Sequence, residues 1–264
     1  MKKNKIKVLS NSFSPNVDLC FNNKVNLYVD LLSVPNREEK NILWLCEPNA
    51  ISNLKNNIDN VANMYDYILT FDEDVLTKYK NAVLHLQASN WISLKEYQPK
   101  EFNISMVVGN KMFAPGHIMR QKLWHKQEKI NNKKFYVGFF GGPENTFNCQ
   151  ILDKGIKDLM FYSQFHIAIE NCSINNYFSE KIIDCFVSKT IPIYWGCKNI
   201  GGFFNEKGVI IFKDIDDAVI KCNLINENTY IEMMPYIEEN YLKAQDFTDW
   251  MKNLIKTINS LNID

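Results

Sequence analysis

The side chains best suited to chemistry lie just after a polar loop in the second half of the chain. Ser179 precedes Glu180 and Lys181 at the start of an apolar segment, with Tyr177 nearby. Serine before an acidic first turn is typical of a helix N-cap, and the N–H groups of a helix N-terminus attract anions. The pattern predicts a phosphate or diphosphate site in which Glu180 can bond sugar hydroxyls or stabilise positive charge on a sugar carbon. The same spacing also fits a helix cap without chemistry.

These residues must be positioned by an α/β framework, because short apolar runs alternate with helix-like periodicity along the chain. Strands are predicted at residues 5–10, 41–46, 67–71, 83–86, 102–108, 135–140, 159–169, 191–195 and 209–212, and a strand or short helix at 27–32. Helices are predicted at residues 50–64, 116–129, 179–188 and 229–259, and a helical turn at 72–79 behind an Asp cap. Pro235 is expected to divide the last helical region in two.

Residues 87–101 are polar and contain a proline, which predicts a linker between two βα-rich halves. Alternating strands and helices favour parallel sheets, and ligands of such sheets bind beyond the carboxyl ends of the strands. We therefore expect a two-domain enzyme with a cleft between the domains.

Composition excludes several classes of protein. The chain has 264 residues, 46% of them hydrophobic, and 30 basic side chains balance 30 acidic ones. This is ordinary globular composition, and the absence of a basic excess disfavours nucleic acid as the main partner. No apolar run approaches the ~20 residues that span a bilayer, and no apolar segment follows the basic N-terminus as in a signal peptide. The expected location is the cytoplasm, or peripherally at a membrane.

No residue pattern predicts a metal site. The seven cysteines include no Cys-x-x-Cys pair and are expected to be buried, reduced thiols. The four histidines show no ligand spacing. Two acidic runs, Asp72-Glu73-Asp74 and Asp214-Ile215-Asp216, have the form of a metal-binding Asp-x-Asp motif, but one tripeptide is a weak signal.

Three sequence motifs in the second half of the chain resemble those of one enzyme family. They are Ile-Glu-Asn-Cys at 169–172, Tyr-Phe-Ser-Glu-Lys-Ile-Ile-Asp at 177–184 and Thr-Ile-Pro-Ile-Tyr-Trp-Gly at 190–196. In order and spacing they are similar to the signature of the α1,3/1,4-fucosyltransferases, glycosyltransferase family 10, and most of all to its bacterial members. The resemblance is strong over about 160–212 and patchy before residue 115.

The resemblance implies a GT-B fold, in which two Rossmann-like domains flank a cleft. Residues 1–100 would form the acceptor-side domain, and residues 101–240 the domain that binds the GDP-sugar donor. Residues 241–264 would form a C-terminal helix that packs back on the N-terminal domain.

The resemblance also implies roles for donor-site residues. Glu180 would contact the fucose and stabilise an oxocarbenium-like transition state, while Lys181 and Arg120 would bind the diphosphate. Asn171 and Tyr177 would line the donor pocket. For Arg120, a solvated residue on a helix surface remains the alternative.

Of the roles that the resemblance implies, that of the catalytic base has the weakest match in sequence. Family members place a glutamate in a Gly-Glu-Asn-type turn after an N-domain strand, whereas this chain has Cys46-Glu47-Pro48-Asn49. Glu47 is the candidate base, and a loop carboxylate without chemistry is the alternative. Gly141 and Gly142 either let the backbone approach the donor or form only a tight turn, and His117 is a further candidate for the same cleft.

The function implied is an inverting transfer of L-fucose from GDP-fucose to a hydroxyl of a glycan acceptor, without a cofactor or a protein-bound metal. Two alternatives remain open at this stage. One is the same fold with another nucleotide-sugar, and the other is a catalytically inactive protein that binds a nucleotide or sugar.

Overall fold

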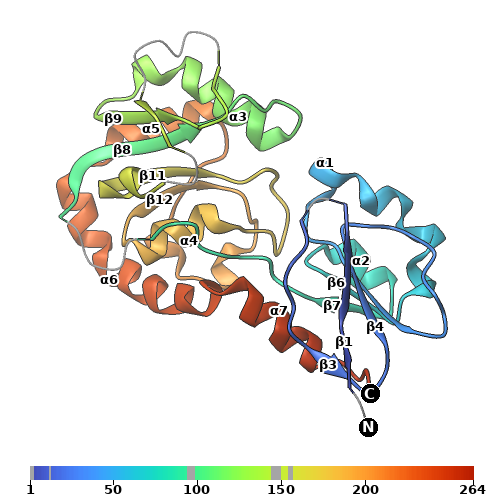
Figure 1. Cartoon of the computed structure of the whole chain (residues 1–264). Coiled ribbons are helices and arrows are strands. Elements are labelled where there is room, and N and C mark those ends of the chain that lie inside the picture. The colour runs from blue at the N-terminus through green and yellow to red at the C-terminus, as the bar shows by residue number, and fades with distance from the viewer. Residues whose placement is uncertain (1–2, 12, 94–98, 144–149, 154–156) are drawn as a thin grey trace. The chain divides into compact units, whose positions relative to one another are not determined.

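The computed structural model describes residues 3–11, 13–93, 99–143, 150–153 and 157–264. They fold into two compact units, which are shown in Figure 1. Unit 1 comprises Met1–Gln87, Ile174–Tyr177 and Asp249–Asp264, and unit 2 comprises Ala88–Ser173 and Phe178–Thr248. The boundaries expected at residues 100 and 240 therefore differ from those of the compact units, and the acceptor and donor roles of the two halves stay predictions.

Unit 1 contains a five-stranded parallel sheet whose strand order follows the chain. Its strands are β2 (Lys7–Ser10), β4 (Val25–Val29), β5 (Lys40–Trp44), β6 (Tyr67–Thr70) and β7 (Ala82–Leu84). A separate antiparallel pair joins β1 (Asn4–Lys5) to β3 (Cys20–Phe21). The region at 27–32, for which a strand or a helix was expected, is a strand that ends at Val29.

The two faces of this sheet are covered by different parts of the chain. Neighbouring residues of a strand point to opposite faces, so Leu43 packs with one apolar cluster and Trp44 with the other. The connections that follow β4, β5 and β6 pack on one face, where Ile58 and Val75 lie buried. The segment between β2 and β4 instead contributes Val17 and Phe21 to the cluster on the opposite face. The opposite face is covered by α7 (Trp250–Asn259), which buries Leu254 and Ile258 in the second cluster (Figure 1).

The helix expected at 50–64 does not form as one element. The segment consists of α1 (Asn49–Ser52) and two 3₁₀ helices, Leu54–Asn60 and Ala62–Met64. Asn53 adopts φ 55°, in the left-handed region, and its side chain bonds Asn56. Asparagine side chains compete with the backbone for hydrogen bonds and favour turns, which explains why apolar spacing overestimated this helix. The short helix α2 (Glu73–Lys78) begins behind the predicted Asp72 cap.

Unit 2 contains a six-stranded parallel sheet in the order β10-β9-β8-β11-β12-β13. Its strands are β8 (Glu101–Val108), β9 (Lys133–Val137), β10 (Gln150–Ile151), β11 (Ser163–Ile169), β12 (Ile191–Trp195) and β13 (Ile210–Ile211). The order reverses between β8 and β11. In parallel sheets this reversal creates a crevice at the carboxyl ends of the strands, where ligands bind.

Four α-helices connect or flank these strands: α3 (Pro115–His125), α4 (Glu180–Val187), α5 (Ile215–Leu224) and α6 (Glu227–Ala244). Short 3₁₀ helices lie at Gln127–Lys129, Asp158–Tyr162, Ile200–Gly202, Glu206–Gly208 and Gln245–Phe247. The strands expected at 135–140 and 159–169 are shorter than predicted, because β9 ends at Val137 and a 3₁₀ helix precedes β11.

The expectation that Pro235 separates two helices is wrong. Pro235 lies inside α6, and the helical region is interrupted only after Ala244. A proline in a helix leaves the carbonyl four residues earlier without its N–H partner. That carbonyl belongs to Ile231, whose side chain is 66% exposed, so water on this face can replace the missing donor.

Among the described residues, no helix is both long and apolar enough to cross a membrane. The six described cysteines form no disulfide. Five of them are buried as expected, but Cys20 is exposed.

Candidate functional site

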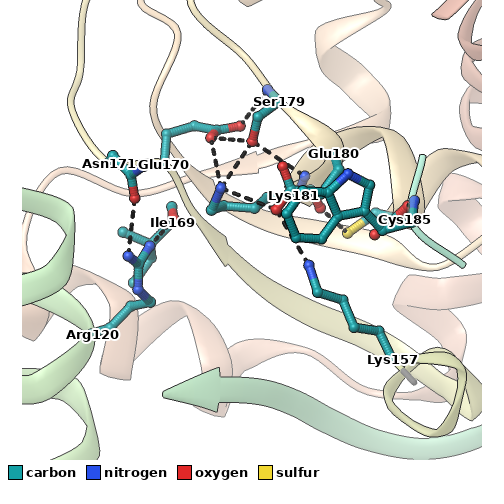
Figure 2. A network of polar contacts seen from close by, with 11 residues as sticks. Arg120, Lys157, Ile169, Glu170, Asn171, Ser179, Glu180, Lys181 and Cys185 are labelled. Carbon is teal, nitrogen blue, oxygen red and sulfur yellow. Dashed lines mark hydrogen bonds and ion pairs between the residues drawn. The ribbon is translucent and has the colours of Figure 1, made fainter. Parts of the chain in front are cut away.

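The predicted donor-site residues of unit 2 meet at the point where β11 ends, beside the reversal of strand order. Ile169 is the last residue of β11. Figure 2 shows Arg120, from α3, on one flank of this strand end, and Lys181, from α4, on the other. The tertiary fold thus brings together residues that lie 61 positions apart in sequence.

Glu170 joins the strand end to helix α4 through its carboxylate. It is 0% exposed. Its Oε1 accepts the backbone N–H of Ser179 at 2.9 Å, and its Oε2 accepts the Ser179 hydroxyl at 2.6 Å and lies 3.6 Å from Lys181 Nζ. Burial raises the pKa of Glu170, against the opposing effect of Lys181.

Two glycines make room for this strand end. A Cβ at Gly196 would lie 2.4 Å from Glu170 Cγ, and a Cβ at Gly116 would lie 1.7 Å from the Glu170 carbonyl oxygen. The Gly116 N–H also donates to the Asn171 carbonyl at 2.9 Å. Larger residues at either position would displace the strand end, so the glycines are required for close packing rather than for backbone flexibility.

Arg120 is held against the same strand end. Its guanidinium donates to the Ile169 carbonyl and, at 3.1 Å, to Asn171 Oδ1. Arg120 is therefore not a freely solvated helix residue, and its charge has a defined position next to Asn171.

Glu180 lies between two lysines. Its Oε1 is 3.2 Å from Lys181 Nζ and 3.2 Å from Lys157 Nζ (Figure 2). Burial alone would raise the pKa of Glu180, but the two cations outweigh burial and lower it. Burial would likewise lower the pKa of Lys181, but Glu180 and Glu170 raise it. Both side chains are therefore charged at neutral pH in the free protein.

The N-terminus of α4 already holds an internal anion. Ser179 is the predicted N-cap, and its hydroxyl accepts the Lys181 N–H at 3.4 Å while its own N–H binds Glu170. These two amides therefore have partners within the protein, and the phosphate site at this helix N-terminus stays a prediction. The side chains of Lys181 and Arg120 are the groups through which this region can hold an anion.

A hollow of about 480 Å³ opens beside Arg120. It is lined by Gly109, Asn110, Lys111, His117, Arg120, Gly138, Phe139, Phe140 and Gly141. Gly141 has φ 94°, a conformation that suits glycine, whereas Gly142 does not line the hollow. Burial, Arg120 and two lysines lower the pKa of His117 to about 4, so the imidazole is neutral and its Nδ1 accepts the Ala114 N–H at 3.3 Å.

Tyr177 does not belong to the same compact unit as the other donor-site candidates. It is 5% exposed, and its ring lies 5.0 Å from that of Phe71 within unit 1. Its predicted place in the donor pocket stays a prediction.

Glu47 follows β5 in unit 1 and is exposed, as a residue that meets substrate must be. Its backbone N–H donates to the Asp30 carboxylate at 3.2 Å, and the same carboxylate accepts the N–H and the thiol of Cys46 at 2.9 and 2.7 Å. Glu47 lines a hollow of about 270 Å³ together with Lys55, Phe71 and Asp72. The predicted strand-end position is confirmed; the role as base is not tested by this geometry.

Sequence reasoning missed three residues that organise these sites: Glu170, Lys157 and Asp30. Glu170 stands directly after a predicted strand, the position that drew attention to Glu47, so that signal was present. Lys157 carries no local signal, because its partner Glu180 is 23 residues away. Asp30 has φ 45° and directly follows β4, where its side chain is free to reach the next strand end.

The two acidic runs have structural roles. Asp72 accepts the N–H groups of Asp74 and Val75 as the cap of α2, and Asp214 caps α5 in the same way. Within the described ranges, no three His, Cys, Asp or Glu side chains are grouped as a metal site.

Comparison with known proteins identifies a family over most of unit 2. Residues 99–261 match the family described as glycosyltransferase family 10 (fucosyltransferase), C-terminal part. An α-(1,3)-fucosyltransferase of Helicobacter pylori, FucT, is 33% identical over 111 residues. That alignment covers 40% of this chain and 22% of FucT, so the chain matches less than a quarter of its curated relative.

Solved structures show the fold over most of the chain. A crystal structure of an α1,3-fucosyltransferase with GDP-fucose has a TM-score of 0.56 at 20% identity, covering 90% of this chain and 78% of that one. The HepE protein of Anabaena in complex with UDP-glucose has a TM-score of 0.61 at 7% identity, covering 90% and 79%. The expected GT-B fold is thereby confirmed.

Proposed function

Since this chain belongs to glycosyltransferase family 10, we propose that it transfers L-fucose from GDP-fucose to a hydroxyl group of a glycan. The observation that carries the proposal is the pairing of Arg120 and Lys181 on either flank of one strand end. A nucleoside diphosphate leaving group needs such fixed cations, because they stabilise the negative charge that grows on it as the glycosidic bond breaks.

In the proposed reaction, Glu47 accepts the proton of the acceptor hydroxyl. The acceptor oxygen attacks the anomeric carbon of fucose from the face opposite GDP and forms the new glycosidic bond. The bond from that carbon to the phosphate oxygen breaks, and its electron pair leaves with GDP. A single displacement of this kind converts a β-linked donor into an α-fucoside.

Glu180 and Asn171 complete the proposed donor site. The lowered pKa of Glu180, caused by its two lysine partners against the effect of burial, keeps a negative charge where the sugar carbon becomes positive. Asn171, which is fixed by Arg120, presents an amide that can bond the donor. We propose that the reaction needs no protein-bound metal, since the acidic runs Asp72–Asp74 and Asp214–Asp216 begin helices through their capping aspartates.

Calorimetric titration with GDP, and with UDP for comparison, tests the donor site. The protein should bind GDP more tightly than UDP, and Lys181→Ala should weaken GDP binding by about 10- to 100-fold, the loss expected for one charge-assisted contact. Lys122→Ala is the matched control, because Lys122 is an exposed lysine of unit 2 that lies on α3. Equal binding of GDP by the protein and by Lys181→Ala would refute the assignment.

A transfer assay tests the reaction itself. GDP-fucose incubated with a panel of glycan acceptors should release GDP and give an α-linked fucoside, with no loss of activity in EDTA. GDP binding without turnover of any donor would instead identify an inactive binding protein, and faster turnover of another nucleotide-sugar would identify a different donor.

A further inference from the structure

Lys157 is the part of the charge network around Glu180 that no sequence motif marks. It precedes the 3₁₀ helix Asp158–Tyr162 and reaches Glu180 from outside α4, with Nζ 3.2 Å from Oε1 (Figure 2). The pair is well shielded, since the side chain of Lys157 is 22% exposed and that of Glu180 is 10% exposed. An ion pair in such a place is stronger than one at the surface, because water and salt screen it less.

Trp91 holds Lys157 on its other side. The Lys157 Nζ lies 4.2 Å from the centre of the indole ring, a close cation–π contact. The backbone N–H of Trp91 in turn donates to Asp184 Oδ1 at 2.7 Å, and Asp184 lies one turn beyond Glu180 on α4. Lys157 is thus fixed by two contacts, and both lead back to the helix that carries Glu180.

The charged groups around Glu180 come from each element packed against it. Lys181 and Lys157 lie at 3.2 Å, and Arg120 acts on Lys181 from α3. Two carboxylates oppose them: Glu170 at the end of β11 and Asp184 on α4, both buried. Lys181 therefore lies beside two carboxyl groups, Glu170 and Glu180, and Lys157 supplies a second cation at Glu180.

We propose that Lys157 is a positioning residue that holds the Glu180 carboxylate ionised and aimed, with Trp91 fixing Lys157 in turn. The proposal deepens the proposed function and rests on it for the catalytic consequence. Lys157 acts through Glu180. Because Lys157 neutralises part of the Glu180 charge, Lys181 is available to bind the diphosphate.

A double-mutant cycle tests the pairing without any substrate. Urea unfolding at pH 7 is measured for the protein, Lys157→Met, Glu180→Gln and the double variant. The coupling should change the unfolding equilibrium constant by at least about tenfold, since breaking a shielded pair leaves an uncompensated charge. The matched control is the Lys189–Glu238 pair, whose atoms are closer, at 2.7 Å, but whose glutamate is 48% exposed. Its coupling should stay below about fivefold. Equal coupling in the two pairs would overturn the proposal.

The split between kcat and KM tests the positioning role. Without Lys157 the Glu180 carboxylate loses one of its two cations and one of the contacts that aim it, so Lys157→Met should lower kcat by about tenfold, more than it raises KM for GDP-fucose. Lys157→Arg should restore kcat, and Lys189→Met should behave as the unmodified protein. Trp91→Leu should give a smaller loss of kcat, and it keeps the test available if Lys157→Met does not fold.

The two experiments separate the two proposals. Strong coupling with an unchanged kcat in Lys157→Met would overturn the positioning role. Absence of GDP-fucose turnover by the unmodified protein would overturn the proposed function, and the cycle would then decide the pairing of Lys157 with Glu180 by itself.

Discussion

The two units hold their candidate side chains in different ways. In unit 2, Glu170 and Glu180 are buried and their carboxylates bind lysines or the Ser179 amide and hydroxyl. In unit 1, Glu47 is exposed, and the contact to Asp30 fixes its backbone rather than its carboxylate. Preorganised charge is an advantage where a fixed transition-state charge must be stabilised, and it costs nothing further at the moment of reaction. A base that must meet a separate acceptor needs access instead.

The structural features that hold these side chains in place also differ between the units. Unit 2 needs glycines at 116 and 196 to bring the strand end close to its helices. Unit 1 buries the Asp30 carboxylate at a residue with φ 45°, and burial raises the pKa of Asp30 although Cys46 and Glu47 donate to it. In both units a missed acidic residue directly after a strand organises the neighbouring candidate.

The largest effect should come from Glu47→Gln, which keeps the backbone contacts to Asp30 but removes the proton acceptor. We expect kcat for fucosyl transfer to fall by about 10²- to 10⁴-fold, the usual contribution of a general base. GDP affinity should stay within twofold, as measured by calorimetry. Glu38→Gln, another exposed carboxylate of unit 1, is the control. Loss of GDP binding in Glu47→Gln would contradict a division of labour between the units.

Leu254→Ala should destabilise unit 1. Leu254 is 0% exposed on α7 and packs in the cluster that contains Trp44 of β5. A buried leucine truncated to alanine costs about 2–5 kcal/mol. Hydrogen exchange should show the loss in β4 and β5, while GDP still binds. Leu242→Ala on α6, where Leu242 is 69% exposed, should cost less than about 0.5 kcal/mol. Similar losses in both variants would show that α7 does not stabilise the sheet.

Arg120→Ala should weaken GDP binding by about 10- to 100-fold, because it removes one of the two cations at the strand end. Calorimetry measures the change, with Lys122→Ala on the same helix as the control. The thermal midpoint of Arg120→Ala separates a lost phosphate contact from a collapsed strand end, since Arg120 also binds Ile169 and Asn171. An unchanged affinity for GDP would remove Arg120 from the donor site.

The smallest effect should be a pH dependence of the stability of unit 1. Burial lowers the pKa of His85 from 6.5 to about 4, and its Nδ1 contacts Thr257 Oγ1 at 2.9 Å. Between those two pH values His85 binds a proton in the unfolded chain but not in the folded chain. The free energy of unfolding therefore falls as pH decreases from about 6.5 to 4. In His85→Gln this slope should diminish by on the order of 1 kcal/mol per pH unit, measured by urea unfolding at several pH values. An unchanged slope would exclude His85 as its source.

Much of the fold was predictable because its signals are local. The buried strands 41–46, 67–71 and 191–195 correspond to β5, β6 and β12, and the caps at Asp72 and Ser179 are confirmed. The errors occur where local and tertiary preferences conflict. Apolar spacing at 50–64 was outweighed by asparagines, and Pro235 is tolerated in α6 because the preceding turn faces solvent.

The residues of the candidate site were predictable from the sequence, but the contacts between them were not. Spacing around Ser179 marks Glu180 and Lys181 but also fits a simple helix cap, and the family resemblance was needed to select them and Asn171. Arg120 lies 61 positions before Lys181, and only the reversal of strand order between β8 and β11 brings both to one strand end. The internal anion at the α4 N-terminus depends on Glu170, which is adjacent in space because β11 and α4 pack together.

The sequence by itself determined the family and the parallel α/β class, and it selected the residues of the proposed donor site, because these depend on motifs and periodicity within short windows. Tertiary structure decided which charges face each other. Lys157 meets Glu180, and Glu170 binds the amide and the hydroxyl of Ser179 at the N-cap of α4. Electrostatic energy depends on distance and burial rather than on sequence separation, so these pairings exist only once the chain has folded.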